Sequence, residues 1–172
     1  RPDRTVTHRV FGIIGWKNSG KTTLVERLVV EFVRRGWRVS TVKHAHHTVD
    51  IDKPGTDSYR HRAAGATEVA LIGGERYAIM RETAEPPLWE VLDRLSPCDL
   101  VLIEGYKREP HLKLEVRTDH LRPMAPADRN IVAISSDVEP VGENLPWFGR
   151  SDVVAMADFI AARASDEPAA CD

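Results

Sequence analysis

Apolar runs alternate with segments of helical periodicity along most of the chain. Residues 9–14 form a short apolar run of strand type, and four consecutive apolar residues at 100–103 suit a strand covered on both faces. Between these runs, residues 24–33 carry apolar side chains at helical spacing. The alternation predicts a three-layer α/β fold with a mainly parallel sheet.

Further periodic segments complete this pattern. They predict helices over 21–35, 57–65, 87–95 and 152–163, and strands over 37–43, 68–72, 76–81, 112–117 and 130–137. The pair of strands around Gly73 and Gly74, and the alternating, half-exposed strand 112–117, are expected to be antiparallel additions. We expect a single domain over 1–172, with residues 1–8 and 165–172 flexible.

A glycine-rich segment joins the first predicted strand to the first predicted helix. It reads GWKNSGKT and fits G-x-x-x-x-G-K-[ST] at every fixed position. Gly15 and Gly20 let the backbone curl so that N–H groups and the helix N-terminus point at phosphate oxygens. In such a loop Lys21 reaches the β- and γ-phosphates and the Thr22 hydroxyl binds Mg²⁺. Together with the alternation, the motif predicts a single nucleotide-binding domain over 1–172 with the three-layer P-loop NTPase fold. The predicted nucleotide-binding residues here are Gly15, Trp16, Lys17, Asn18, Ser19, Gly20, Lys21, Thr22 and Thr23.

Carboxylates outside this loop are candidates for the metal side of the site. Glu104 ends the apolar strand, where an acid can hold Mg²⁺, directly or through water, or polarise an attacking water. Lys21 and Glu104 are therefore the predicted catalytic pair. Asp50 and Asp52 lie in a loop after the second strand, and such loops face the ligand side of a parallel sheet. These two acids either reach the metal or form an exposed acidic loop.

A basic and histidine-rich cluster follows the second predicted strand. It consists of Lys43, His44, His46 and His47. Imidazoles are common ligands of transition metals, but the alternative is that these residues contact phosphates or a partner's substrate, or line the cleft. Lys107 and Arg117 are further candidates for neutralising an anionic ligand.

Asp137 lies at the end of the predicted buried strand 130–137 and can accept hydrogen bonds from a base ring. The guanine-reading pattern N-K-x-D does not occur in the sequence. The motifs therefore do not identify the base.

Composition narrows the function classes. The formal net charge is −2, which gives no bulk electrostatic case for binding nucleic acid or an acidic membrane. No apolar stretch approaches the ~20 residues of a membrane span. The two cysteines lack metal-binding spacing and do not suggest a disulfide framework. No secretory signal opens the chain, so the cytoplasm is the expected location.

The combined motifs closely resemble the MobB family, the adapter proteins of molybdopterin-guanine dinucleotide biosynthesis. The resemblance rests on the loop 15–22, the segment KHAHH…DIDKPGTDS at 43–58, the Ala-Gly-Ala at 64–66 and DLVLIEGYK at 99–107. It covers most of the chain from Arg9 to Asp137.

This resemblance implies a homodimer of P-loop subunits that binds GTP with Mg²⁺ and hydrolyses it slowly. It also implies partnership with the guanylyltransferase MobA, and leaves open whether molybdopterin itself contacts the chain. The family's nucleotide role maps onto residues 15–23, its metal-side acid onto Glu104 and its polar loop onto residues 43–58.

Two other functions share the same motifs. A small-molecule kinase using ATP or GTP would need a pocket for an acceptor group and a lid, for which the loops 44–56 and 118–129 are candidates. A non-catalytic interaction module would use the nucleotide to order a surface loop. The adapter hypothesis implies that the protein is at most a weak GTPase.

Overall fold

The computed structural model describes residues 8–45 and 51–166, and these form two compact units. The first unit comprises residues 1–44 and 89–172, and the second comprises residues 45–88. The single nucleotide-binding domain over 1–172 expected from the sequence stays a prediction. Within the described residues, no helix is long and apolar enough to cross a membrane.

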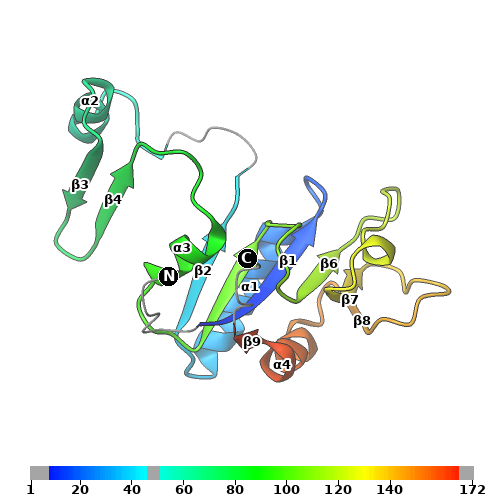
Figure 1. The fold of residues 1–172 in the computed structure, drawn as a ribbon. Helices are drawn as coiled ribbons and strands as arrows, with labels where there is room; N and C mark the ends of the chain where they lie inside the picture. Colours follow the sequence, from blue (N-terminus) through cyan, green and yellow to red (C-terminus); the bar gives the residue numbers. More distant parts are fainter. Residues whose placement is uncertain (1–7, 46–50, 167–172) are drawn as a thin grey trace. The chain divides into compact units, whose positions relative to one another are not determined.

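The first unit is built on one mainly parallel sheet (Figure 1). Its strands run in the order β2-β5-β1-β6-β7-β8, and a short strand, β9, pairs antiparallel with β1. Their bounds are β1 Arg9–Gly15, β2 Val39–Lys43, β5 Leu100–Glu104, β6 Lys113–Val116, β7 Ile131–Ser136, β8 Trp147–Gly149 and β9 Ser165–Asp166. All other pairings are parallel, so the predicted mainly parallel α/β fold is confirmed.

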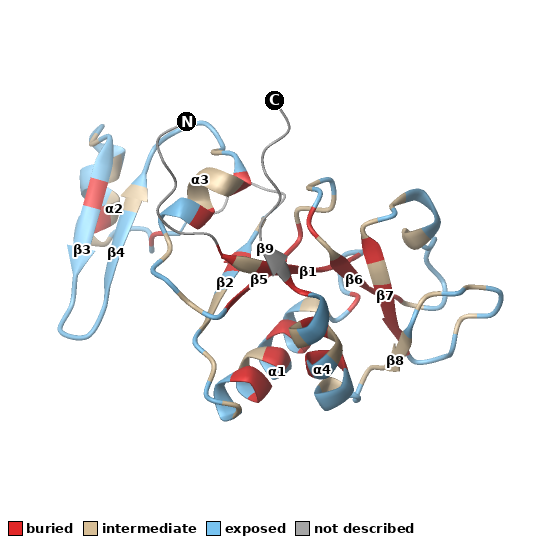
Figure 2. Ribbon diagram, turned by 60° about the horizontal axis from the view of Figure 1, so that its bottom comes forward, coloured by how far each residue is buried: buried red, intermediate tan, exposed pale blue. Residues whose placement is uncertain are grey.

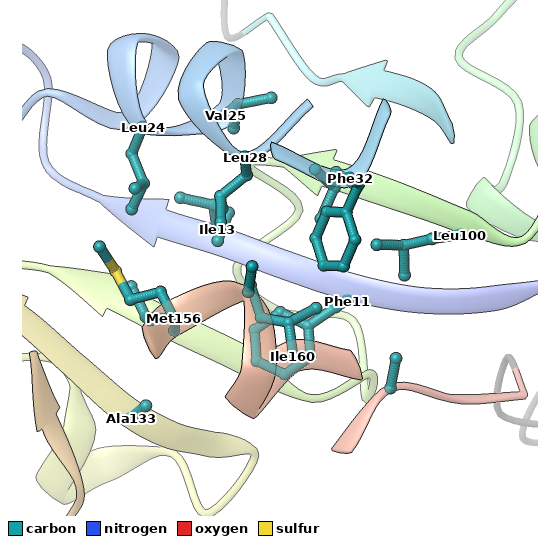
Figure 3. Close-up of a cluster of buried hydrophobic side chains, with 14 of the residues drawn as sticks. Phe11, Ile13, Leu24, Val25, Leu28, Phe32, Leu100, Ala133, Met156 and Ile160 are labelled. Carbon is teal, nitrogen blue, oxygen red and sulfur yellow. The ribbon is translucent and has the colours of Figure 1, made fainter. Parts of the chain in front are cut away.

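Two helices of the first unit pack on one face of this sheet. Helix α1 (Lys21–Arg34) and helix α4 (Val153–Arg163) lie side by side there (Figure 2). Phe11 of β1, Phe32 of α1 and Ile160 of α4 are fully buried in the core that the sheet and these two helices share (Figure 3). Helix α3 (Leu88–Asp93) begins at the last residue of the second unit, and its other residues belong to the first unit. A short 3₁₀ helix covers Ala125–Ala127.

The second unit is small. Helix α2 (Asp57–Ala63) precedes an antiparallel hairpin of β3 (Glu68–Ile72) and β4 (Tyr77–Arg81). This hairpin is the predicted antiparallel pair around Gly73 and Gly74. Most of its side chains are exposed, with Val69 the buried residue of β3.

The prediction for residues 112–117 was wrong in orientation and in exposure. Strand β6 is parallel to both β1 and β7, and all four of its residues are buried. The polar members of the alternation, Lys113 and Glu115, are buried because each finds partners inside the protein. Lys113 Nζ donates to Glu109 O and lies 3.3 Å from Asp128, while Glu115 accepts from the backbone N–H groups of residues 124 and 125 and from Arg117.

Two short strands were not predicted. The segment 140–150 has no clear periodicity, yet residues 147–149 form β8 beside β7. Residues 165 and 166, assigned above to a flexible end, form β9. Strands of two or three residues are too short to carry a recognisable period.

Candidate nucleotide-binding site

The glycine-rich loop lies between the carboxyl end of β1 and the first turn of α1. Gly20 (φ 94°) and Asn18 (φ 61°) have left-handed backbone conformations, and Ser19 N–H donates to Trp16 O at 3.2 Å. A Cβ at Gly15 would lie 2.5 Å from Ser19 Oγ and 2.6 Å from the Val116 carbonyl. The loop is therefore curled, and its start is packed tightly against β6.

The side chain of Lys21 folds back over this loop. Its Nζ donates to Trp16 O at 2.8 Å. Burial lowers the pKa of Lys21 below its ordinary value, and the nearby charges of Lys107 and Lys43 lower it further, while Glu104 acts in the opposite direction. A ligand phosphate at the loop would supply the negative charge that this ammonium group needs.

Thr22 and Glu104 meet at the mouth of the loop. Thr22 Oγ1 donates to Glu104 Oε1 at 2.7 Å, and Lys43 Nζ lies 3.5 Å from the same oxygen. Glu104 is 7% exposed. A hydroxyl and a carboxylate side by side fit Mg²⁺, which takes hard oxygen ligands and keeps several of its waters. The structure thus brings together two of the four predicted metal ligands.

Trp16 of the loop and Lys107 contact each other. Trp16 is 40% exposed, its indole N–H donates to Arg122 O at 2.7 Å, and Lys107 Nζ lies 4.7 Å from its ring centroid. This contact has the geometry of a cation–π interaction. Lys17, Asn18 and Thr23 are exposed, as contacts for a ligand require.

His44 lies at the carboxyl end of β2. Its backbone N–H donates to Glu104 O at 2.9 Å, and its ring stacks on Tyr106 with centroids 4.3 Å apart. The stack places an imidazole and a phenol at the same sheet edge as Glu104. The predicted role of His44 in contacting a substrate or partner stays a prediction.

Arg117 is engaged by carboxylates of its own unit. Its guanidinium donates to Glu115 at 3.1 Å and to Glu143 at 2.9 Å, and the residue is 8% exposed. These ion pairs account for its charge within the protein. Its predicted contact with a ligand stays a prediction.

The other candidates lie in or near the second unit. His46, His47 and Asp50 fall outside the described residues. Asp52 belongs to the second unit, where Ser58 Oγ donates to it at 2.8 Å and Arg62 Nε lies 3.6 Å away. Among residues 8–45 and 51–166, no group of three or more His, Cys, Asp or Glu side chains could hold a metal. That leaves the transition-metal alternative for the histidine cluster untested.

One residue of this site was missed by the sequence analysis. Arg150, between β8 and α4, donates to Ser19 O at 2.7 Å and to Arg117 O, and its Nε lies 3.2 Å from Asp137 Oδ1. Asp137, the predicted base contact, directly follows β7 and is exposed. No motif marks Arg150, since it lies in a segment without periodicity.

Comparison with known proteins shows the family of the chain. The family model MobB, described as molybdopterin guanine dinucleotide synthesis protein B, matches residues 10–137. The molybdopterin-guanine dinucleotide biosynthesis adapter protein of Haemophilus influenzae is 38% identical over 156 residues, covering 88% of this chain and 86% of the relative. The adapter protein of the same description from Escherichia coli is 37% identical over 159 residues, covering 88% and 90%.

A solved structure supports the same relationship. The MobB protein homolog from Bacillus stearothermophilus superposes with a TM-score of 0.67 at 28% identity, over 90% of this chain and 99% of that chain. The resemblance stated from the sequence motifs is thereby confirmed. Because the family model and two relatives match over most of its length, the chain belongs to the MobB family of molybdopterin-guanine dinucleotide biosynthesis adapter proteins.

Proposed function

We propose that this protein is a GTP-binding adapter of molybdenum cofactor biosynthesis. In this proposal it binds GTP with Mg²⁺, hydrolyses it slowly and assists the guanylyltransferase MobA, as a homodimer in the cytoplasm. The observation that carries the nucleotide part is the contact of Thr22 with Glu104 beside the curled loop and Lys21. Family membership supports the pathway, since the relatives are described as adapters of that biosynthesis.

Each group in the loop would have one task. The N–H groups of the loop and of the first turn of α1 bind the phosphates, and Lys21 exchanges its bond to Trp16 O for a phosphate oxygen. Thr22 and Glu104 would hold Mg²⁺, which would neutralise phosphate charge. Glu104 would also orient water on the metal side.

Slow turnover fits the charges around the loop. An arginine finger raises the rate of phosphoryl transfer by about 10³–10⁵. In the described part of the chain, the guanidinium of Arg150 contacts the loop by donating to the backbone carbonyl of Ser19, and it donates also to that of Arg117. A guanidinium held in this way stabilises the loop and not the transferred phosphoryl group.

Nucleotide binding is tested by calorimetric titration of Mg-GTP and Mg-ATP into the wild-type protein and the variant Lys21→Ala. We expect GTP binding in the wild type and a loss of at least about tenfold in the variant, because a charge-assisted bond to phosphate disappears. Arg163→Ala is the control, since Arg163 lies over the Phe159 ring at the end of α4. Unchanged GTP affinity in Lys21→Ala would refute the assignment.

A groove beside the site gives one reason to keep a kinase as the second candidate. It has a volume of about 380 Å³ and runs between α1 and the edge strand β2. Thr22, Glu104 and Lys43 line one part of it, and valines of α1 and β2 line the rest together with Glu26 and Thr41. An acceptor bound there would lie next to the predicted metal ligands. A screen for transfer of the γ-phosphate from ATP or GTP to small acceptors decides between the two functions.

The adapter role itself requires a partner assay. We expect MobA to bind the wild-type protein. If the protein is instead the interaction module whose surface loop is ordered by the nucleotide, the affinity for MobA depends on the nucleotide. The measurement compares MobA binding with GTP, with GDP and without nucleotide. Equal affinity in all three states would remove the switch, and no binding in any state would remove the partnership.

A further inference from the structure

Arg150 joins three parts of the candidate site that are distant in sequence. Its Nη1 donates to Ser19 O in the glycine-rich loop at 2.7 Å, and its Nη2 donates to Arg117 O at the end of β6. Its Nε lies 3.2 Å from Oδ1 of Asp137, directly after β7. One planar cation therefore contacts the phosphate loop and the predicted base-binding carboxylate.

On the loop side this contact is close. A Cβ at Gly20 would lie 3.0 Å from Nη1 of Arg150, so the guanidinium packs against the turn that begins α1. Ser19, whose carbonyl accepts the hydrogen bond, is 2% exposed. Since the N–H groups of a guanidinium form a rigid fork, a shift at one contact is transmitted to the other two.

On the Asp137 side, the carboxylate that contacts Arg150 is exposed to solvent. The Asp137 side chain is 69% exposed. The Arg150 Nε–H is buried and has no aligned hydrogen-bond acceptor in the described part of the chain, so its contact with Asp137 is an ion pair without hydrogen-bond geometry. An ionised carboxylate only accepts hydrogen bonds. Its second oxygen therefore suits a base with ring N–H donors, such as guanine, and does not suit the N1 acceptor of adenine.

We propose that Arg150 is a positioning residue that couples Asp137 to the phosphate loop. A base bound to Asp137 fixes the carboxylate, the carboxylate fixes the guanidinium, and the guanidinium fixes the Ser19 carbonyl in the loop that holds the phosphates. Base and phosphates then strengthen each other's binding, as coupled sites must do reciprocally. This inference rests on the proposed nucleotide binding and adds to it a residue outside the sequence motif.

The test titrates Mg-GTP and Mg-inorganic triphosphate into wild type, Arg150→Ala, Asp137→Asn and the double variant. We expect Arg150→Ala to weaken triphosphate binding about five- to tenfold and GTP binding more, so that the advantage of GTP over triphosphate shrinks. Asp137→Asn should lower that advantage and leave triphosphate binding unchanged. The double variant should lower it by less than the sum of the two single losses, because Arg150 acts through Asp137.

Three results would overturn the coupling. They are triphosphate affinity unchanged within about twofold in Arg150→Ala, an unchanged advantage of GTP in that variant, and fully additive losses in the double variant. Both ligands are titrated into one preparation, so their affinity ratio does not depend on the folded fraction. A purely structural role of Arg150 would leave this ratio unchanged.

Controls separate this inference from the proposed function. Arg163→Ala removes an arginine from the end of α4 and should behave as wild type. Arg150→Lys keeps the charge without the fork and should lose most of the coupling. If the wild type binds neither ligand, the proposed function fails. If Lys21→Ala loses both ligands while Arg150→Ala changes neither, only the coupling fails.

Discussion

The start of the glycine-rich loop leaves no room for a side chain. Gly15 ends β1, where a side chain would meet Ser19 Oγ at 2.5 Å and the Val116 carbonyl at 2.6 Å. Val116 O belongs to the backbone of β6, which is paired on both sides and has little freedom to move. The loop is therefore built on a contact between two backbones that a single methyl group would disrupt.

We expect Gly15→Ala to destabilise the fold by about 1–3 kcal/mol, because the added carbon overpacks this contact. It should also weaken nucleotide binding, since the loop would shift. The measurement is urea unfolding combined with titration of Mg-GTP. The matched control is Gly74→Ala, where a Cβ would meet nothing within 4 Å. Equal stabilities for the two variants would contradict the packing argument.

His111 makes stability depend on pH. It is 2% exposed, and burial, together with the charge of Lys113, lowers its pKa from 6.5 to about 3. Between these two values the unfolded chain binds a proton that the folded chain does not, so stability falls as pH decreases from about 6.5 to about 3. Above that window the histidine is neutral in both states and contributes no pH dependence.

Replacing this imidazole should flatten the acid limb of the stability curve. We expect urea unfolding of His111→Gln between pH 7 and pH 4 to show a smaller decrease in unfolding free energy than the wild type shows. His61→Gln is the control, because His61 is exposed on α2. Parallel curves for wild type and His111→Gln would show that other groups carry the acid sensitivity.

At the scale of elements, strand β6 depends on a buried carboxylate. Glu115 is 1% exposed and accepts from Met124 N–H at 2.7 Å, from Ala125 N–H at 3.0 Å and from Arg117 at 3.1 Å. It thereby ties the strand to the segment that leads into the 3₁₀ helix. Removing the Glu115 carboxylate leaves the two backbone donors without their acceptor, while Arg117 keeps its ion pair with Glu143.

We expect Glu115→Ala to lower the free energy of unfolding by about 1–3 kcal/mol, the cost of leaving buried donors without their acceptor. Glu68→Ala is the control, because its 2.5 Å pair with Arg81 on the hairpin is 41–43% exposed on both sides. An exposed pair of that kind is worth about 0–1 kcal/mol. Denaturant unfolding of both variants measures the difference, and equal losses would contradict the role of burial.

The burial of strand β6 could not be predicted from the sequence, although β5 and the start of α1 could. The continuous apolar run 100–103 and the motif at 15–22 predict β5 and the start of α1, because each has a single structural meaning. In contrast, Lys113 and Glu115 indicate exposure by residue type. Their partners at residues 109, 124, 125 and 128 are brought together only by the fold, so no local pattern predicts their burial.

The candidate site divides in the same way. Lys21, Thr22 and Glu104 are found from the sequence because the motif fixes two of them and a strand end marks the third. Arg150 reaches Ser19 across 131 positions of sequence, from a segment with no regular pattern. A long-range contact between a side chain and a backbone carbonyl leaves no signature in residue type.

At the scale of the whole molecule, the hairpin of the second unit leaves apolar side chains exposed. Ile72, Tyr77 and Ile79 are 79%, 72% and 58% exposed. Ile72 pairs with Tyr77 and Ala70 pairs with Ile79, so these side chains share one face of the hairpin. A two-stranded hairpin is marginally stable by itself, and an exposed apolar face on it fits the proposed homodimer, with a second copy as the cover.

We expect the wild type to sediment as a dimer and Ile72→Asp with Ile79→Asp to shift it toward monomer, because a carboxylate in an apolar interface must be desolvated. Analytical ultracentrifugation over a range of protein concentrations measures the shift. Val141→Asp is the matched control, since Val141 lies in the first unit and is 97% exposed. A dimer of unchanged strength in the double variant would place the interface elsewhere, and a monomeric wild type would remove the homodimer from the proposal.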